Sequence, residues 1–342
     1  MTRITVILAT VISLAFTSLA AQDFQKGLAA YNAGDFATAL KEWKPLAEDG
    51  YVSVQVNLGI MYSEGKAVRQ DFAEAVKWFR LAANQGNAKA QINLGVMHKT
   101  GQGVPQDYEE ALKWFLLAAN QGHALAQYNL GVLYEYGQGV PQDYEEALKW
   151  FLLAANQGDA HAQTILGIKY AEGKGVPQDY AEAAKWYRLA AEQGDAGAQA
   201  LLGFMFYDGQ GVPQDYAEAA KWCRLAANQG HAVAQIRLGF MHKTGKGVSQ
   251  DLVDAVKWWR RAANQGNAKA QTILGVMYSE GDGVLQNNVM AHMWSNIGSA
   301  NGDETAGTNR DILSKQMTQA AIEEAQAMAR ECMNSGYTNC GF

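Results

Sequence analysis

A serine and a lysine lie close together near the start of the chain, at a spacing that could support nucleophilic catalysis. Ser63-Glu64-Gly65-Lys66 matches the S-x-x-K pattern, in which a lysine assists a serine nucleophile. The stretch recurs at residues 279–282 as Ser-Glu-Gly-Asp, without the lysine. The K-T-G sequence that would accompany such a pair occurs at residues 243–245, but it repeats the Lys-Thr-Gly of residues 99–101. We therefore interpret these residues as parts of a repeated loop, and we predict no catalytic residue and no enzyme activity.

The histidines do not form a recognisable site. His98 and His242 lie in identical Met-His-Lys-Thr-Gly stretches, which favours a structural role for both. The sequence contains no H-E-x-x-H pattern of a zinc peptidase, no G-x-S-x-G and no P-loop. We therefore expect no metal site and no cofactor.

The three cysteines suggest one disulfide bond. Cys332 and Cys340 lie close together near the C-terminus, and in an oxidising compartment such a pair predicts a local disulfide. Cys223 stands apart and is predicted to be a buried thiol. A zinc site would need a second pair of ligands, which the sequence lacks.

Residues 1–20 resemble a signal peptide. Arg3 precedes an apolar run over residues 4–16, and Ser18-Leu19-Ala20 supplies small residues at a cleavage site. An uncleaved membrane anchor is the alternative, although the run is short for spanning a bilayer. We expect an exported protein, periplasmic or secreted, with no integral membrane segment in its mature form.

The charge of the chain excludes some classes of partner. The formal net charge is −6 and the pI is about 5.6. Nucleic acids and anionic membrane surfaces attract basic faces, so neither is an expected partner.

A 36-residue repeat organises most of the sequence. Glycines recur at this interval at Gly50, Gly86, Gly122, Gly158, Gly194, Gly230, Gly266 and Gly302. Leu-Gly and Lys-Trp pairs recur at the same interval, and residues 101–122 are identical to residues 137–158. Self-similarity at a period of 20–50 residues indicates a solenoid, in which each unit packs on its neighbours.

Each unit is predicted to contain two helices. In residues 87–122, the first helix covers 87–100, and the glycines and proline of residues 101–106 then prevent its continuation. Asp107, with Glu110 three residues later, predicts a capping box at the start of the second helix.

The repeated pattern is A-x-A-Q-x-x-L-G-x-x-Y-x-x-G-x-G-V-x-Q-D-Y-x-E-A-x-K-W-x-x-x-A-A-x-Q-G. It resembles the Sel-one-like repeat (SLR) family, a relative of the tetratricopeptide repeat, over seven units in residues 51–302. Residues 21–50 resemble a tetratricopeptide-like capping hairpin, and residues 303–342 resemble the closing helices of this family. The resemblance implies an all-α, right-handed α/α superhelical solenoid of tandem helix-turn-helix repeats.

Comparison of the seven copies separates constant from variable positions. Ala90, Gln91, Leu94, Met97 and His98 share one side of a helical wheel, and their counterparts barely vary, so this side is predicted to be core. A glycine inside each first helix, such as Gly95, predicts a helix crossing too tight for a Cβ atom.

The opposite arc of the first helices varies between copies. By analogy with related solenoids, these helices should line a concave groove that is partly apolar, and such an exposed stripe commonly marks a partner surface. The alternative is that these residues pack on neighbouring units. The residues predicted to contact a partner are Lys89, Asn93, Leu125, Tyr128, Asn129, Tyr136, His161, Ile165, Leu201, Phe204, Arg237 and Phe240.

Two functions from different classes follow from these observations. The first is a secreted or periplasmic scaffold that binds a protein or peptide segment in its groove; the resemblance implies roles in envelope signalling, polysaccharide export or host contact. The alternative is a module that binds peptidoglycan fragments, or a weak β-lactamase-like enzyme, as suggested for disulfide-rich relatives. The sequence identifies neither the partner nor the oligomeric state.

Overall fold

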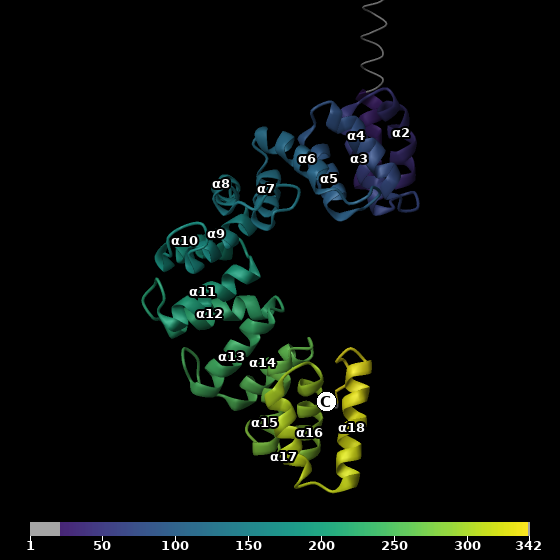
Figure 1. The fold of residues 1–342 in the computed structure, drawn as a ribbon. Coiled ribbons are helices and arrows are strands. Elements are labelled where there is room, and N and C mark those ends of the chain that lie inside the picture. The colour runs from purple at the N-terminus through teal and green to yellow at the C-terminus, as the bar shows by residue number, and fades with distance from the viewer. Residues whose placement is uncertain (1–20, 341–342) are drawn as a thin grey trace, which may run out of the picture. The chain divides into compact units, whose positions relative to one another are not determined.

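The protein is built from helix hairpins in tandem (Figure 1). The computed structural model describes residues 21–340, and within that range helices and loops account for the whole chain, with no β-strand. The predicted all-α solenoid of helix-turn-helix repeats is therefore confirmed. The predicted signal peptide, residues 1–20, lies outside the described residues. No helix between residues 21 and 340 is long and apolar enough to cross a membrane.

We call the first helix of each repeat its A helix and the second its B helix. The A helices are α3 (Val52–Glu64), α5 (Ala88–Thr100), α7 (Ala124–Tyr136), α9 (Ala160–Glu172), α11 (Ala196–Asp208), α13 (Ala232–Thr244) and α15 (Ala268–Glu280). The B helices are α4 (Phe72–Asn84), α6 (Tyr108–Asn120), α8 (Tyr144–Asn156), α10 (Tyr180–Glu192), α12 (Tyr216–Asn228), α14 (Leu252–Ala263) and α16 (Asn288–Ala300). Two helices precede the repeats, one over residues 21–32 and α2 (Phe36–Glu48), and two follow them, α17 (Glu304–Ser314) and α18 (Gln319–Asn334).

The described part of the chain divides into two compact units, with the boundary between Ala162 and Gln163. In the first unit, α3 packs on α4, α5 on α6 and α7 on α8, while α4 and α6 also pack on the A helix that follows each. In the second unit, the pairs α11–α12, α13–α14 and α15–α16 are linked in the same way. Within a unit, such a B helix therefore buries one side against its own A helix and another side against the A helix of the next repeat.

The boundaries of the helices follow from their caps. The A helices end at a left-handed glycine, such as Gly101 with φ 74°. At the start of α6, the Asp107 carboxylate accepts a hydrogen bond of 3.0 Å from the backbone N–H of Glu110. The reciprocal half of the predicted capping box does not form, because the Asp107 N–H already donates to the carbonyl of His98 at 2.8 Å. The Glu110 side chain instead pairs with Lys113 at 2.6 Å.

In five of the seven A helices, the internal glycine permits contact with an aromatic side chain of the B helix, whereas Gly203 meets Cys223 and Gly275 meets Ser295. A Cβ atom on Gly131 would lie 2.6 Å from Cε1 of Phe151, a ring that is almost fully buried. Gly59, Gly95, Gly167 and Gly239 meet Phe79, Phe115, Tyr187 and Trp259 in the same way. The predicted close crossing is confirmed, and the atoms that exclude a Cβ belong to this aromatic ring.

Within each unit, a buried glutamine ties a repeat to the helix that precedes it. Gln91 Nε2 donates to the carbonyl of Ala83, near the end of the preceding B helix, at 3.2 Å. Its Oε1 atom accepts a 2.8 Å hydrogen bond from Gln121, at the end of its own B helix. Equivalent amide pairs join Gln85 to Gln55, Gln157 to Gln127, Gln193 to Gln163, Gln229 to Gln199 and Gln265 to Gln235, and Asn301 takes the place of the outer glutamine beside Gln271.

The C-terminal helices cover the last repeat. Both α17 and α18 pack on α16, and the predicted Cys332–Cys340 disulfide closes the turn after α18. The Tyr337 hydroxyl lies within hydrogen-bonding distance of the Asn301 side chain. Cys223 is a buried free thiol, as predicted, and burial raises its pKa to about 12.

Candidate interaction surface

The candidate surface consists of the A-helix residues that differ from one repeat to the next. In the first unit this surface is partly apolar. Lys89 is exposed, and Asn93 beside it is half-buried, with its Nδ2 atom donating to the Lys89 carbonyl at 2.9 Å. One repeat further on, Leu125 is 43% exposed and Tyr136 is 69% exposed. These side chains are accessible to a partner.

Tyr128 and His161 belong to one aromatic cluster. The Tyr128 ring lies 6.0 Å from the ring of Phe151 and 6.2 Å from the exposed imidazole of His161, centroid to centroid. Burial raises the pKa of Tyr128, and the nearby Asp159 charge adds to the effect. Tyr128 therefore joins the core of its repeat to the surface.

Asn129 was predicted to be a contact residue, but its side chain is buried. It is only 6% exposed, its Nδ2 atom donates to the carbonyl of Leu125 at 2.8 Å, and its Oδ1 atom accepts from Lys99 at 3.3 Å. Partial burial lowers the pKa of Lys99. Because neighbouring residues of the protein cover the Asn129 side chain, we exclude it from the contact surface.

In the second unit the corresponding face carries aromatic rings and a guanidinium group. Ile165, Leu201 and Phe204 are half-buried, whereas Phe240 is 36% exposed and packs edge-on against Trp259. The Arg237 guanidinium carbon lies 5.0 Å from the centroid of the Phe204 ring.

Two cavities of similar construction lie on the A-helix faces, one in each unit. The first, about 380 Å³, lies between α3 and α5 and includes Lys89 in its lining. The second, about 280 Å³, lies between α13 and α15 and includes Lys269. Sequence reasoning did not single out Lys269, although a signal was present, because residues 87–91 and 267–271 have the same sequence, Asn-Ala-Lys-Ala-Gln.

The serine–lysine pair near the start of the repeats lacks the geometry of a nucleophile and its base. The Ser63 hydroxyl donates to the carbonyl of Ile60 at 2.8 Å. Lys66 instead pairs with Glu64 at 2.7 Å and lies 3.0 Å from the Tyr31 hydroxyl. The Glu64 and Tyr31 contacts raise the pKa of Lys66, so the amine stays protonated and cannot accept a proton from serine.

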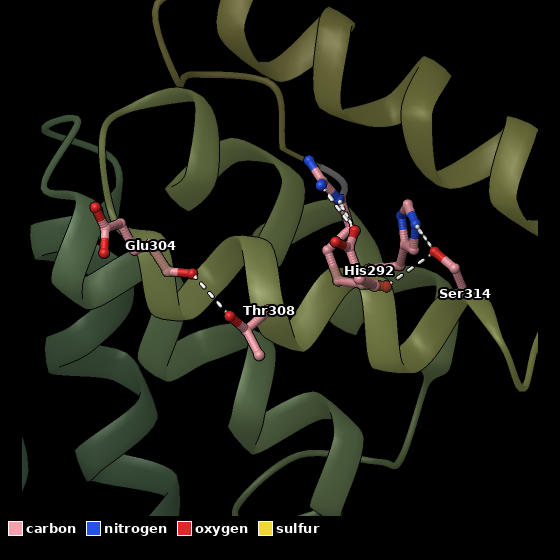
Figure 2. Close-up of polar contacts among 6 residues, drawn as sticks. His292, Glu304, Thr308 and Ser314 are labelled. Carbon is pink, nitrogen blue, oxygen red and sulfur yellow. Dashed lines mark hydrogen bonds and ion pairs between the residues drawn. The ribbon is translucent and has the colours of Figure 1, made fainter.

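A second serine lies beside a buried histidine, as Figure 2 shows. His292 Nε2 and the Ser314 hydroxyl are 3.0 Å apart, between α16 and α17. The Ser314 hydroxyl also donates to the carbonyl of Arg310, and the buried Nδ1 atom of His292 has no partner. Burial lowers the pKa of His292, and the Arg310 charge lowers it further. Without an acid on Nδ1, this pair resembles a packing contact more than a catalytic triad.

The B helices present a contrasting charged surface. Each lysine before the repeated tryptophan pairs with an acidic residue three positions earlier: Lys77 with Glu74, Lys113 with Glu110, Lys149 with Glu146, Lys185 with Glu182, Lys221 with Glu218 and Lys257 with Asp254. These charges are neutralised within their own helices. Between residues 21 and 340, no group of three or more His, Cys, Asp or Glu side chains could hold a metal ion.

The comparisons with known proteins agree with this architecture. The family model described as Sel1 repeat matches seven consecutive segments, residues 52–87, 88–123, 124–159, 160–195, 196–231, 232–267 and 268–303. The chain is similar to the crystal structure of a Sel1 repeat protein from Oxalobacter formigenes, with 35% identity, a TM-score of 0.69, and coverage of 89% of this chain and 90% of that one. It is also similar to a protective antigen of uropathogenic Escherichia coli strains that displays an SLR fold, with 28% identity, a TM-score of 0.57 and 96% coverage of both chains. No curated protein matches the sequence.

Proposed function

Because the chain belongs to the Sel1 repeat family, we propose that it is an exported scaffold whose A-helix faces bind a segment of a partner protein. One observation carries this proposal. The seven repeats share their core, their caps and a buried glutamine, while the exposed residues of the A helices differ from one repeat to the next. A uniform frame with a variable, partly apolar face is typical of a binding surface.

Export is supported by the C-terminal disulfide and by one relative. Disulfide bonds such as Cys332–Cys340 persist in oxidising compartments. The similar protein from uropathogenic Escherichia coli strains is a protective antigen, and it matches this chain over almost the whole length of both. We propose that this chain likewise acts in the cell envelope or outside the cell, in signalling or in host contact.

We propose no catalytic role for the protein. The Lys66 amine is protonated and paired, and the Ser63 hydroxyl is directed to a backbone carbonyl. A reporter β-lactam assay with Ser63→Ala as the control tests this point, since serine-dependent turnover would establish the enzymatic alternative.

The scaffold proposal is tested by affinity capture from the native envelope and the secreted fraction. The bait is the mature protein, compared with a variant that carries Leu125→Glu and Phe240→Glu, one change on the A-helix face of each unit. The matched control carries Leu117→Glu and Leu225→Glu, which are leucines of similar exposure on the B helices, 49% and 42%.

A partner that is lost by the A-helix variant and kept by the B-helix variant supports the proposal. Circular dichroism must show that all three proteins are equally folded. If the B-helix variant alone loses the partner, the A-helix faces are not the binding site and the proposal is wrong.

A further inference from the structure

The pocket between α13 and α15 combines apolar walls with two cationic groups. Its cavity of about 280 Å³ is lined by Val233, Ile236, Arg237, Phe240, Asn267 and Lys269. Val233 is 51% exposed and Phe240 is 36% exposed, so a large apolar surface remains open to a ligand. The volume is close to the lower end of the range for small-molecule pockets, and we expect it to hold about one or two side chains of a peptide.

The cationic groups of this pocket lack an acidic partner. Neither Arg237 nor Lys269 forms a salt bridge with any carboxylate among residues 21–340, whereas the lysine before each repeated tryptophan on the B helices is paired, as Lys257 is with Asp254. No acidic residue lines the pocket. On a chain of net charge −6, this is a local positive site whose charge is not compensated internally.

Arg237 is held in place by aromatic rings. Its guanidinium carbon lies 5.0 Å from the centroid of the Phe204 ring and 4.7 Å from that of Tyr207. A stacked guanidinium loses less side-chain freedom when it binds a carboxylate, so part of the entropic cost of binding is already met. The equivalent positions in the other repeats hold Asn57, Asn93, Asn129, Ile165, Leu201 and Ile273, so the cation is specific to this repeat.

The pocket between α3 and α5 provides an internal comparison. Lys89 takes the place of Lys269 there, and Asn57 takes the place of Arg237. This first-unit pocket is lined by Lys89 and His123 and has no arginine, and it should bind an anionic group more weakly.

From these features we propose that the α13–α15 pocket binds an acidic segment of the partner protein, a proposal that rests on the scaffold function given above. An apolar side chain of the segment packs against Val233, Ile236 and Phe240. A neighbouring Asp or Glu carboxylate lies between Arg237 and Lys269, where both groups can donate hydrogen bonds to it. The apolar walls favour a peptide over a free inorganic anion, because an anion alone would leave them exposed to water.

The test measures fluorescence anisotropy of a fluorescein-labelled synthetic peptide in which Glu and Leu alternate, titrated with the full mature protein. Two matched peptides replace every Glu by Gln or every Leu by Ser. We expect saturable binding of the Glu/Leu peptide and binding about tenfold weaker for each matched peptide.

Protein variants then place the peptide in the pocket. Arg237→Asn and Lys269→Ser introduce residues found at the same positions of other repeats, Asn57 and Ser53, so the fold should tolerate both. The double variant should bind the Glu/Leu peptide about tenfold more weakly, and Lys257→Ser on α14 should leave its binding unchanged. Lys89→Ser, in the first-unit pocket, should have the smaller effect of the two pocket lysines.

The proposal is overturned if the Glu/Leu peptide shows no saturable binding up to about 1 mM. It is also overturned if the Gln/Leu peptide binds equally well, or if the Arg237→Asn, Lys269→Ser variant binds like the wild type. These outcomes are distinguishable from failure of the scaffold proposal, because envelope capture that still depends on Leu125 and Phe240 would leave the scaffold intact. The photo-reactive substitution Phe240→benzoylphenylalanine should label an acidic segment of the captured partner, and labelling of a neutral or basic segment contradicts the assignment.

Discussion

At the scale of single residues, the glycine inside each A helix should be intolerant of even a methyl group. In Gly131→Ala, the new Cβ would lie 2.6 Å from Cε1 of the buried Phe151 ring. Overpacking of this kind typically destabilises a protein by about 1–3 kcal/mol. Urea unfolding measures the change, and Gln102→Ala on an exposed loop position is the control. Equal unfolding midpoints for the two variants would show that the crossing has room to relax.

A buried histidine should make the first unit sensitive to acid. His98 is 6% exposed, and neither of its ring nitrogens has a hydrogen-bond partner. Burial lowers the pKa of His98, and the Arg80 charge lowers it further, although Glu110 and Asp107 oppose the shift. The unfolded chain therefore binds a proton near pH 6.5 that the folded chain does not bind, and stability falls as the pH drops below that value.

The matched variant is His98→Tyr, because Tyr62 and Tyr134 occupy the same position in the adjacent repeats. We compare the free energy of unfolding at about pH 7.5 and about pH 5.5. The wild type should lose more stability on acidification than the variant, by at most about 1.4 kcal/mol per pH unit for one proton. Parallel pH profiles for the two proteins would exclude His98 as the sensitive group.

The sequence predicted the roles of some residues better than others. A helical wheel places Leu94 and Gln91 on the core side, and the structure agrees because the repeat constrains those positions in every copy. The wheel cannot show that Asn129 is covered, since its burial depends on local packing and on a hydrogen bond to Lys99 from the repeat before. Exposure at the edge of a helix face depends on neighbouring side chains as well as on position in the helix.

At the scale of the helices, the glutamine pairs should contribute to the free energy of unfolding by linking helices that pack on each other. Gln199 is buried, donates to the carbonyl of Ala191 at 3.1 Å, and accepts from Gln229 at 2.8 Å. Gln199→Ala leaves the buried Ala191 carbonyl without this donor, which should destabilise the protein by about 1–3 kcal/mol. Gln229 lies at the surface, so Gln229→Ala should cost less.

A double-mutant cycle on Gln199 and Gln229 measures their coupling directly. We expect an interaction energy of about 0.5–1.5 kcal/mol, typical of a hydrogen bond between neutral groups. Additive effects of the two substitutions would mean that the hydrogen bond between the two side chains contributes no interaction energy to stability. The repeated Gln was predictable as a core residue, but its partner was not, because the two glutamines are 30 residues apart in sequence.

At the scale of the whole molecule, the 36-residue period predicted the architecture, and the family matches and the helix order confirm it. The period predicts much less about binding, because it describes what the repeats share, whereas the proposed subsite depends on what one repeat does not share. The sequence placed Arg237 among the predicted contact residues, but it could not show that the guanidinium stacks on the rings of Phe204 and Tyr207. The sequence did not single out Lys269, because it could not show that Lys269 and Arg237 line the same pocket.

Nearest-neighbour packing predicts that damage at one end of the array stays local. The Cys332–Cys340 bond closes a short loop beside α18, which packs on α16. In Cys332→Ser combined with Cys340→Ser, loss of this cross-link should destabilise the C-terminal helices by about 2–3 kcal/mol on the loop-entropy estimate. Since each repeat of a solenoid contacts only its neighbours, the helices of the first unit should be unaffected.

Hydrogen exchange followed by mass spectrometry should therefore show faster exchange in α16, α17 and α18 and unchanged exchange in α3 to α6, with Cys223→Ala as the control for loss of a thiol. Faster exchange in α3 to α6 as well would mean that the array unfolds as a single cooperative unit, and the local description of its stability would be wrong.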